Sequence, residues 1–266
     1  MSRNRMFWGI VIIVMGIIFL LQSIGLIQVN VWSLLGPFLI ILLGGTLIYR
    51  TMFPNRSSLE LKSLSLPVDG IEHVSVEIKH GAGKLKIQAG KEPDTLLKGD
   101  FHGGVEHTLS QNGTRANLSL RPHVDTVTMI PFTGPTEGYV WNVDFNPGLQ
   151  YEFELKTGAG ESQINFLDLP VSRIRLETGA SSTYMTVPGK AGFTRVDVHA
   201  GAASVEIKIP EGVAARIRIQ SGMASNSVDT ARFPEADGYY CSPDYESSEN
   251  KVEIFIDGGV GSFKIY

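Results

Sequence analysis

The tripeptide Gly-Ala-Gly at residues 158–160 is the first place where the sequence could do chemistry, because glycine-rich loops bind phosphate through backbone N–H groups. Nucleotide-binding loops need either a third glycine or a Gly-Lys-Ser/Thr ending, and they continue into a helix. Gln163 stands where the third glycine would be, and residues 162–169 alternate like a β-strand. The sequence therefore favours a chain turn over a nucleotide site.

Histidines and carboxylates are the next candidates for catalysis or metal binding. His80, His102 and His107 lack metal-ligand spacing, so we interpret them as surface histidines. Glu152 and Glu154 lie two residues apart in an alternating segment, which is typical of solvated strand positions rather than of an acid/base pair. Sequence signatures of serine hydrolases, zinc proteases and deaminases are absent. We therefore expect no enzymatic activity, no cofactor and no metal site.

Arginines give the pattern most typical of a binding surface. In successive copies of a repeated segment, Arg173, Arg195 and Arg216 fall in one outward column, where like charges repel unless an anionic group faces them. Two interpretations stay open, a solvated flank and a docking face for acidic lipid or protein. The candidate interaction face includes the neighbouring column and consists of Arg173, Arg175, Arg195, Arg216 and Arg218.

The repeated segment that positions these side chains is centred on a glycine and occurs six times. Four of the copies are spaced by 21, 22 and 21 residues, and a fixed period of this length predicts a solenoid. Each copy has two alternating strands around a small-residue corner, where a residue without Cβ is expected to take a positive φ. The predicted corner residues are Gly81, Gly158, Gly179, Gly201, Gly222 and Gly259.

The predicted fold is an all-β solenoid of stacked parallel repeats, each about 21–22 residues long. Its handedness stays open, although parallel crossovers are generally right-handed. The apolar positions before each corner predict one inward wall, and those six residues after each glycine predict the opposite wall. The ten positions before the corners are Phe153, Leu155, Ile174, Leu176, Val196, Val198, Ile217, Ile219, Ile254 and Ile256; the six after them are Ile87, Ile164, Met185, Ile207, Val228 and Ile265.

Two insertions interrupt the period. In the first, near residues 88–150, Asn112-Gly113 predicts a hairpin between strands near 105–111 and 114–120, and the insertion is interpreted as a cap on the stack. The second, near residues 230–250, is an acidic surface loop. Its Tyr239, Tyr240 and Tyr245 either pack against the flank of the solenoid or line a binding surface.

The N-terminal part is strongly apolar. Residues 6–27 carry no charge and residues 32–49 form a second apolar run, which predicts a transmembrane helical hairpin within residues 1–50; a signal peptide is the competing reading of the first run. Arginines at 3, 5, 50 and 56 place both ends of the hairpin in the cytoplasm by the positive-inside rule. We expect a linker at 51–66 and a cytoplasmic β domain at 67–266.

Composition excludes some functions. The chain has 266 residues, a net charge of −4 and one cysteine, Cys241, so we expect neither a nucleic-acid partner nor an internal disulfide. Membrane lipid is an expected partner, and homo-oligomerisation stays open.

The sequences "GIVIIVMGIIFLLQSIGLI", "WSLLGPFLIILLGG" and "WNVDFNPGLQYEFELKTGAGESQINFLDLP" resemble those of LiaF-like bacterial membrane proteins of the cell-envelope stress response. The resemblance implies a rack-like β domain and a non-enzymatic regulator whose partner is a membrane sensor kinase or another envelope protein. Having only two expected helices and a long acidic insertion sets this chain apart from that family. A surface adhesin or structural scaffold is the alternative function, and an enzyme acting on envelope polysaccharide is disfavoured because no carboxylate cluster is evident.

Overall fold

The computed structural model describes residues 13, 44–45, 61–123 and 139–266. Residues 57–266 form one compact unit, in which the described strands belong to a single 13-stranded mixed sheet. The strands are β1 Leu61–Pro67, β2 His73–Ala89, β3 Thr95–His102, β4 Glu106–Asn112, β5 Arg115–Arg121, β6 Tyr139–Phe145, β7 Gln150–Asn165, β8 Val171–Thr186, β9 Phe193–Lys208, β10 Ala214–Val228, β11 Glu235–Ala236, β12 Tyr239–Cys241 and β13 Lys251–Ile265.

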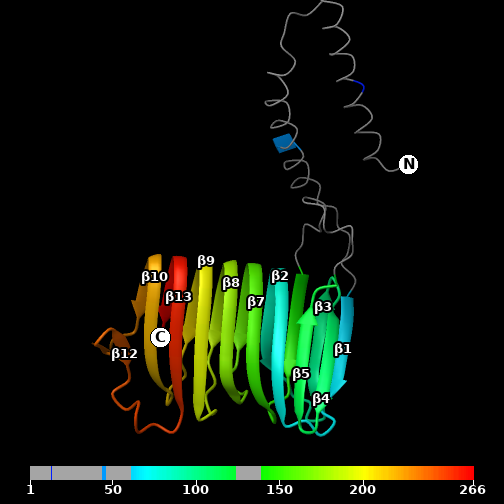
Figure 1. Ribbon diagram of the computed structural model, residues 1–266, viewed down its shortest axis with the longest axis horizontal. Coiled ribbons are helices and arrows are strands. Elements are labelled where there is room, and N and C mark those ends of the chain that lie inside the picture. Colours follow the sequence, from blue (N-terminus) through cyan, green and yellow to red (C-terminus); the bar gives the residue numbers. More distant parts are fainter. Residues whose placement is uncertain (1–12, 14–43, 46–60, 124–138) are drawn as a thin grey trace, which may run out of the picture. The chain divides into compact units, whose positions relative to one another are not determined.

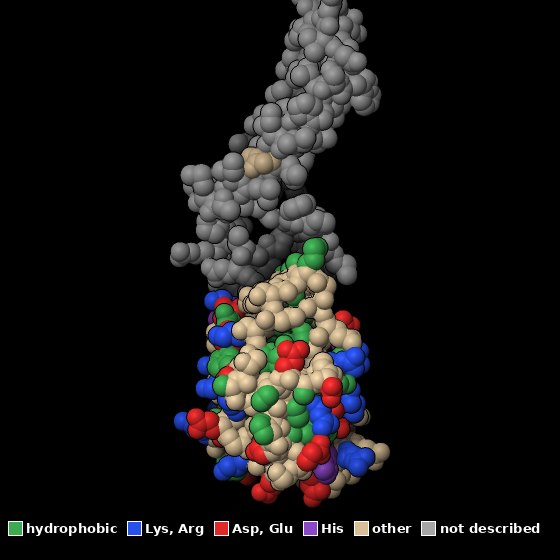
Figure 2. Space-filling model, turned by 90° about the vertical axis from the view of Figure 1, so that its left-hand side faces the viewer, with side chains coloured by type: hydrophobic (Ala, Val, Ile, Leu, Met, Phe, Trp, Pro, Cys, Tyr) green, Lys and Arg blue, Asp and Glu red, His purple; other side chains and the backbone are tan. Residues whose placement is uncertain are grey.

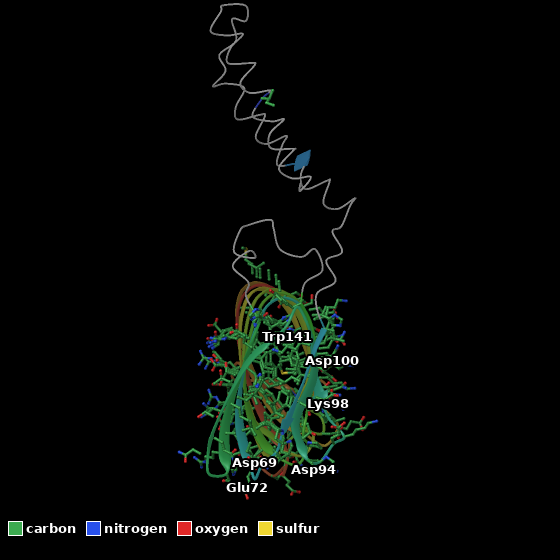
Figure 3. All side chains as sticks on the ribbon, turned by 90° about the vertical axis from the view of Figure 1, so that its right-hand side faces the viewer. Asp69, Glu72, Asp94, Lys98, Asp100 and Trp141 are labelled. Atoms are coloured by element: carbon green, nitrogen blue, oxygen red, sulfur yellow. The ribbon has the colours of Figure 1, made fainter. Side chains whose placement is uncertain are left out.

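Six long strands make the body of the sheet, and they pair in parallel in the order β2-β7-β8-β9-β13-β10. Each is continuous through the predicted corner, where it bends, so that the sheet folds over itself as an arch (Figures 1 and 3). We call the strand halves before and after the bend the first wall and the second wall. The prediction of an all-β fold built from stacked parallel repeats is thus confirmed.

Alternation within the strands places the core between the two walls. In β7, Phe153, Leu155 and Ile164 are each at most 2% exposed. The same inward columns continue through neighbouring strands, as predicted. The inward residues are less buried at the β10 end of the sheet, where Ile219 and Val228 are only partly covered.

The corner glycines have a different role from the predicted one. None of the six has a positive φ; in three strands a glycine two residues later, such as Gly160 at φ 140°, has it instead. Five of the six predicted glycines lie where strands approach closely, whereas Gly81 has open space at its Cβ position. A Cβ on Gly179 would lie 2.8 Å from the carbonyl oxygen of Gly158, and one on Gly259 would lie 2.7 Å from that of Gly201.

The order of the strands also differs from the sequence order. Strand β13 lies between β9 and β10 and pairs with both along its whole length, so that Ile254 faces Val196 on one side and Ile217 on the other. The last copy of the repeat therefore does not continue the stack beyond β10. Viewed from the β10 end, Lys and Arg side chains lie along both flanks (Figure 2).

The insertion near residues 88–150 extends both walls. Strand β2 pairs through its first half with β5 and through its second half with β6. Strand β4 continues the first extension beyond β5, and β3 and then β1 continue the second extension beyond β6. The hairpin is confirmed as β4 and β5, with Gly113 at φ 61° in its turn. Trp141 lies inside the arch and is fully buried (Figure 3).

The predicted linker at 51–66 overlaps the sheet. Strand β1 begins at Leu61 and pairs antiparallel with β3, where Leu66 faces Leu97. The β domain therefore starts before Pro67, because the alternating residues of β1 cover the edge of β3. The predicted helical hairpin lies outside the described residues, and within them no helix is long and apolar enough to cross a bilayer.

Candidate functional site

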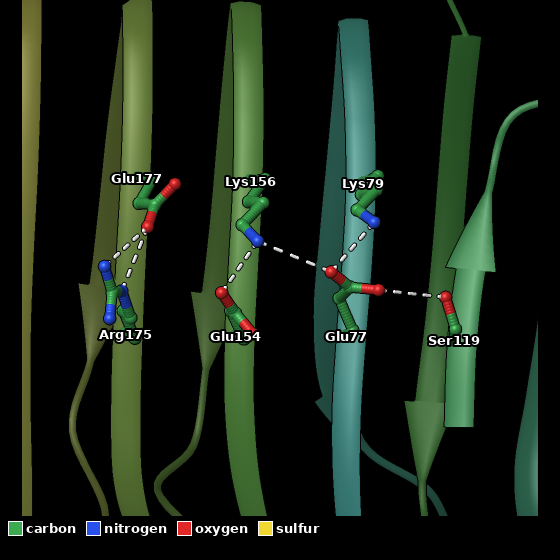
Figure 4. Close-up of polar contacts among 7 residues, drawn as sticks. All are labelled: Glu77, Lys79, Ser119, Glu154, Lys156, Arg175 and Glu177. Atoms are coloured by element: carbon green, nitrogen blue, oxygen red, sulfur yellow. Dashed lines mark hydrogen bonds and ion pairs between the residues drawn. The ribbon is translucent and has the colours of Figure 1, made fainter. Parts of the chain in front are cut away.

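The outer face of the first wall is covered by ion pairs that run along the strands. Residues two apart in one strand point to the same face, and Lys79 pairs with Glu77 at 2.9 Å, as Arg175 does with Glu177 (Figure 4). Hydrogen bonds from Lys79, Ser119 and Lys156 lower the pKa of Glu77. Ion pairs also join neighbouring strands of this wall, since Lys156 lies 3.4 Å from Glu77 and Arg121 lies 3.0 Å from Glu106.

The predicted column of three stacked arginines is wrong, because β13 separates two of its members. Glu253 of β13 pairs in register with Arg195 on one side and Arg216 on the other. Its carboxylate lies 3.8 Å from Arg195, which also contacts Asp197 at 3.0 Å. Arg173 and Arg195 remain adjacent, so like charges meet at only one step of the column.

Three of the five predicted arginines converge where β12 folds against the first wall. They line a cleft of about 190 Å³, which we call the arginine cleft. Its lining residues are Arg195, Asp197, Arg216, Arg218, Tyr239, Glu253, Ile254 and Phe255. Arg173 and Arg175 lie outside it on β8.

The two arginines on β10 are held by aromatic residues. The guanidinium carbon of Arg216 lies 4.4 Å from the ring centre of Tyr245, and its Nη2 is 2.6 Å from Glu246. Arg218 lies 5.3 Å from the ring centre of Tyr239 and donates a hydrogen bond to its hydroxyl at 3.1 Å. Within the described residues Arg218 has no carboxylate partner, so most of its five donors stay open to an anion.

The acidic loop near residues 230–250 packs against the flank and also forms one side of the cleft. Strand β12 pairs with β10 at Arg216 and Ile217, and Phe233 and Tyr245 are buried. Burial raises the pKa of Tyr245. The packing interpretation is confirmed, since Tyr245 anchors the loop, whereas the binding surface stays a prediction in which Tyr239 lines the cleft.

The sequence did not identify Glu253 and Phe255 as members of the site. Both lie on β13, whose repeat phrase was recognised but was expected to follow β10. Their alternation with Val252 and Ile254 indicated outward positions, yet nothing in the sequence indicated which strands they would face.

Among the histidines, His80 is not at the surface. It is 3% exposed, lies edge-on to Trp141 with ring centres 5.1 Å apart, and burial lowers its pKa to about 4. His107 is exposed and His102 partly so. Residues 61–123 and 139–266 contain no group of three His, Cys, Asp or Glu side chains that could hold a metal ion.

Stacked parallel strands that form an arch, with a charged cleft on the outer face of one wall, are the features of a β-repeat protein. The chain belongs to the toast_rack N-terminal domain family, DUF2154, because the sequence model of that family matches residues 55–208. No curated protein matches it.

A solved structure resembles the β domain in fold. A "putative cell adhesion protein" from Clostridium sporogenes ATCC 15579 has a TM-score of 0.70 at 19% identity over 77% of this chain and 98% of its own. A "putative adhesin" from Bacteroides fragilis NCTC 9343 has a TM-score of 0.32 at 9% identity over 79% and 98%. The clostridial match shows that the same arch occurs as the whole of another chain.

Proposed function

We propose that this protein is a membrane-anchored, non-enzymatic binding protein that regulates a cell-envelope stress response, as the resemblance to LiaF-like proteins implies. The single observation that carries the binding role is the arginine cleft. Its Arg218 lacks a carboxylate partner among the described residues while being held in place by Tyr239. Fixing a guanidinium in this way lowers the entropic cost of binding a carboxylate or phosphate.

The partner that fits the cleft is an acidic segment of another envelope protein, with a membrane sensor kinase as the candidate. Arg216 is bound to Glu246, whose side chain is 82% exposed, so an incoming carboxylate could displace it at low cost. A segment that carried two acidic residues would contact Arg216 and Arg218, which lie two residues apart on one strand.

Affinity capture from the protein's own cells tests the proposal. We expect the intact chain to retain an envelope protein with an acidic segment, and Arg218→Gln to lose it. The matched control is Arg175→Gln, which removes an arginine of the same wall outside the cleft. Equal recovery of the same proteins by all three chains would contradict a role for the cleft.

Adhesion is the second candidate, because the name of the clostridial protein refers to it and the fold is shared. Topology separates the two functions, since adhesion requires the β domain to lie outside the cell. We propose that the domain is cytoplasmic on the basis of the flanking arginines. A cytoplasm-specific fluorescent reporter after Tyr266 should therefore give signal, whereas a dark, intact fusion would favour adhesion.

A further inference from the structure

The second wall carries a shallow depression that the proposed function does not use. Its volume is about 620 Å³, and it crosses β2, β7, β8 and β9 and reaches the last residue of the chain. The outward side chains that line it and carry the argument are Lys86, Gln163, Tyr184, Glu206, Lys208 and Tyr266. It lies on the other half of the strands from the arginine cleft.

An unusually exposed aromatic residue lies within this depression. Tyr184 is 49% exposed, and its side chain makes no hydrogen bond or ring contact within the described part of the chain. Its neighbours in register are Gln163 and Glu206, and Tyr266, 37% exposed, lines the same depression. A flat aromatic ring flanked by amide and carboxylate groups suits a sugar, whose C–H face packs on the ring while its hydroxyls form hydrogen bonds.

The charges in the depression favour a ligand with acidic groups. Glu161 and Glu206 are neutralised by Lys84 and Lys264, at 3.8 and 3.3 Å. Lys86 and Lys208 have no ion pair among the described residues and are exposed. They lie on β2 and β9, three strand spacings apart, or about 14 Å, so that a single small anion cannot satisfy both.

A row of hydroxyl groups adjoins the depression. Four outward serines occupy neighbouring strands in register, starting on β8 and β9 beside the depression and continuing onto β13 and β10, and none of their hydroxyl groups has a hydrogen bond within the described residues. Adjacent strands are about 4.8 Å apart, so a polymer that crosses them meets the same group at regular steps. The serines are Ser182, Ser204, Ser262 and Ser225.

We propose that this depression binds a linear polysaccharide that carries acidic groups, with a sugar ring on Tyr184 and anionic substituents at Lys86 and Lys208. Carboxylated and phosphorylated sugars share the required charge, and the experiment distinguishes them. The two sites share no residue, so binding at one does not require the other. A polysaccharide of the cell envelope reaches this wall only if the β domain lies outside the membrane, the arrangement that also favours adhesion.

Calorimetric titration of the full chain in neutral detergent tests this proposal. The probes are a hexasaccharide of galacturonate and a phosphorylated hexasaccharide of glucose, with an unmodified glucose hexasaccharide and poly-glutamate as controls. We expect at least one acidic sugar to bind more tightly than both controls. Failure of both acidic sugars to bind, or equal binding by poly-glutamate, would overturn the proposal.

Substitutions in the depression test whether the ligand binds at the second wall. Tyr184→Ala should weaken binding at least about tenfold, whereas Tyr184→Phe should retain it, since the ring and not the hydroxyl carries the contact. The double change Lys86→Gln and Lys208→Gln should weaken binding and reduce its salt dependence. Phe193→Ala is the matched control, because Phe193 is 47% exposed on the first wall. Unchanged affinity in Tyr184→Ala would contradict the assignment.

Discussion

The carbonyl oxygen of Gly81 occupies the space that a Cβ on Gly158 would need. The two glycines lie at the bends of the adjacent strands β2 and β7, between the register pairs His80–Thr157 and Ala82–Ala159. Close approach, rather than a positive φ, therefore explains the glycine at position 158. Gly81 itself has open space where its own Cβ would lie.

This asymmetry predicts different outcomes for two chemically identical changes. Gly158→Ala should lower the free energy of unfolding by at least about 2 kcal/mol, because the methyl group forces β7 away from β2. Gly81→Ala should change it by less than about 0.5 kcal/mol, since nothing lies within 4 Å of the added atom. Urea denaturation of both variants measures the difference. Similar losses would argue against close approach as the cause.

The buried His80 predicts a dependence of stability on pH. Its pKa is lowered to about 4 in the folded chain, against about 6.5 when unfolded, so between these values the unfolded chain binds more protons. The stability contributed by neutral His80 should be complete above about pH 6.5 and be lost as pH falls toward 4, by roughly 2–3 kcal/mol.

His80→Phe is the control for this dependence, because a phenyl ring keeps the edge-on contact with Trp141 and cannot be protonated. Unfolding midpoints in urea at pH 7 and at pH 5 should differ less in the variant than in the parent. An identical pH dependence in both chains would show that another group is responsible.

The pairing of β1 with β3 predicts how far the domain can be shortened at its N-terminal side without losing stability. A fragment of residues 57–266 should be more stable than one of residues 68–266 by at least about 2 kcal/mol, because removing β1 uncovers β3 and the contact of Leu66 with Leu97. Thermal unfolding of both fragments measures this. If they melted at the same temperature, β1 would contribute nothing to the domain.

Glu253 limits the positive charge of the arginine cleft. Glu253→Gln should raise affinity for an acidic peptide severalfold, because the carboxylate that faces Arg195 is removed. Stability should change by less than about 1 kcal/mol, since the pair is exposed. Asp257→Asn, on the same strand but outside the cleft, is the control and should leave peptide affinity unchanged.

Local patterns made the repeats and the β4–β5 hairpin predictable from the sequence. Alternation identified inward residues such as Phe153 and Ile174, and Asn112-Gly113 located a turn. The position of β13 could not be predicted, because residues 229–250 break the period and the repeat phrases share one alternating pattern that does not specify a neighbour. The error about the arginine column follows from that single difference. His80 was misjudged because its burial depends on Trp141, which comes from the insertion.

The central claim, that the arginine cleft binds acidic groups of a partner, is tested most directly by titrating the 57–266 fragment with an acidic peptide at several salt concentrations. The account predicts binding that weakens as salt rises, and a loss of at least about tenfold in Arg218→Gln with unfolding unchanged. Arg175→Gln, on the same wall, should bind as the parent does. Binding that is absent in the parent, or equal in the Arg218 and Arg175 variants, would contradict the claim.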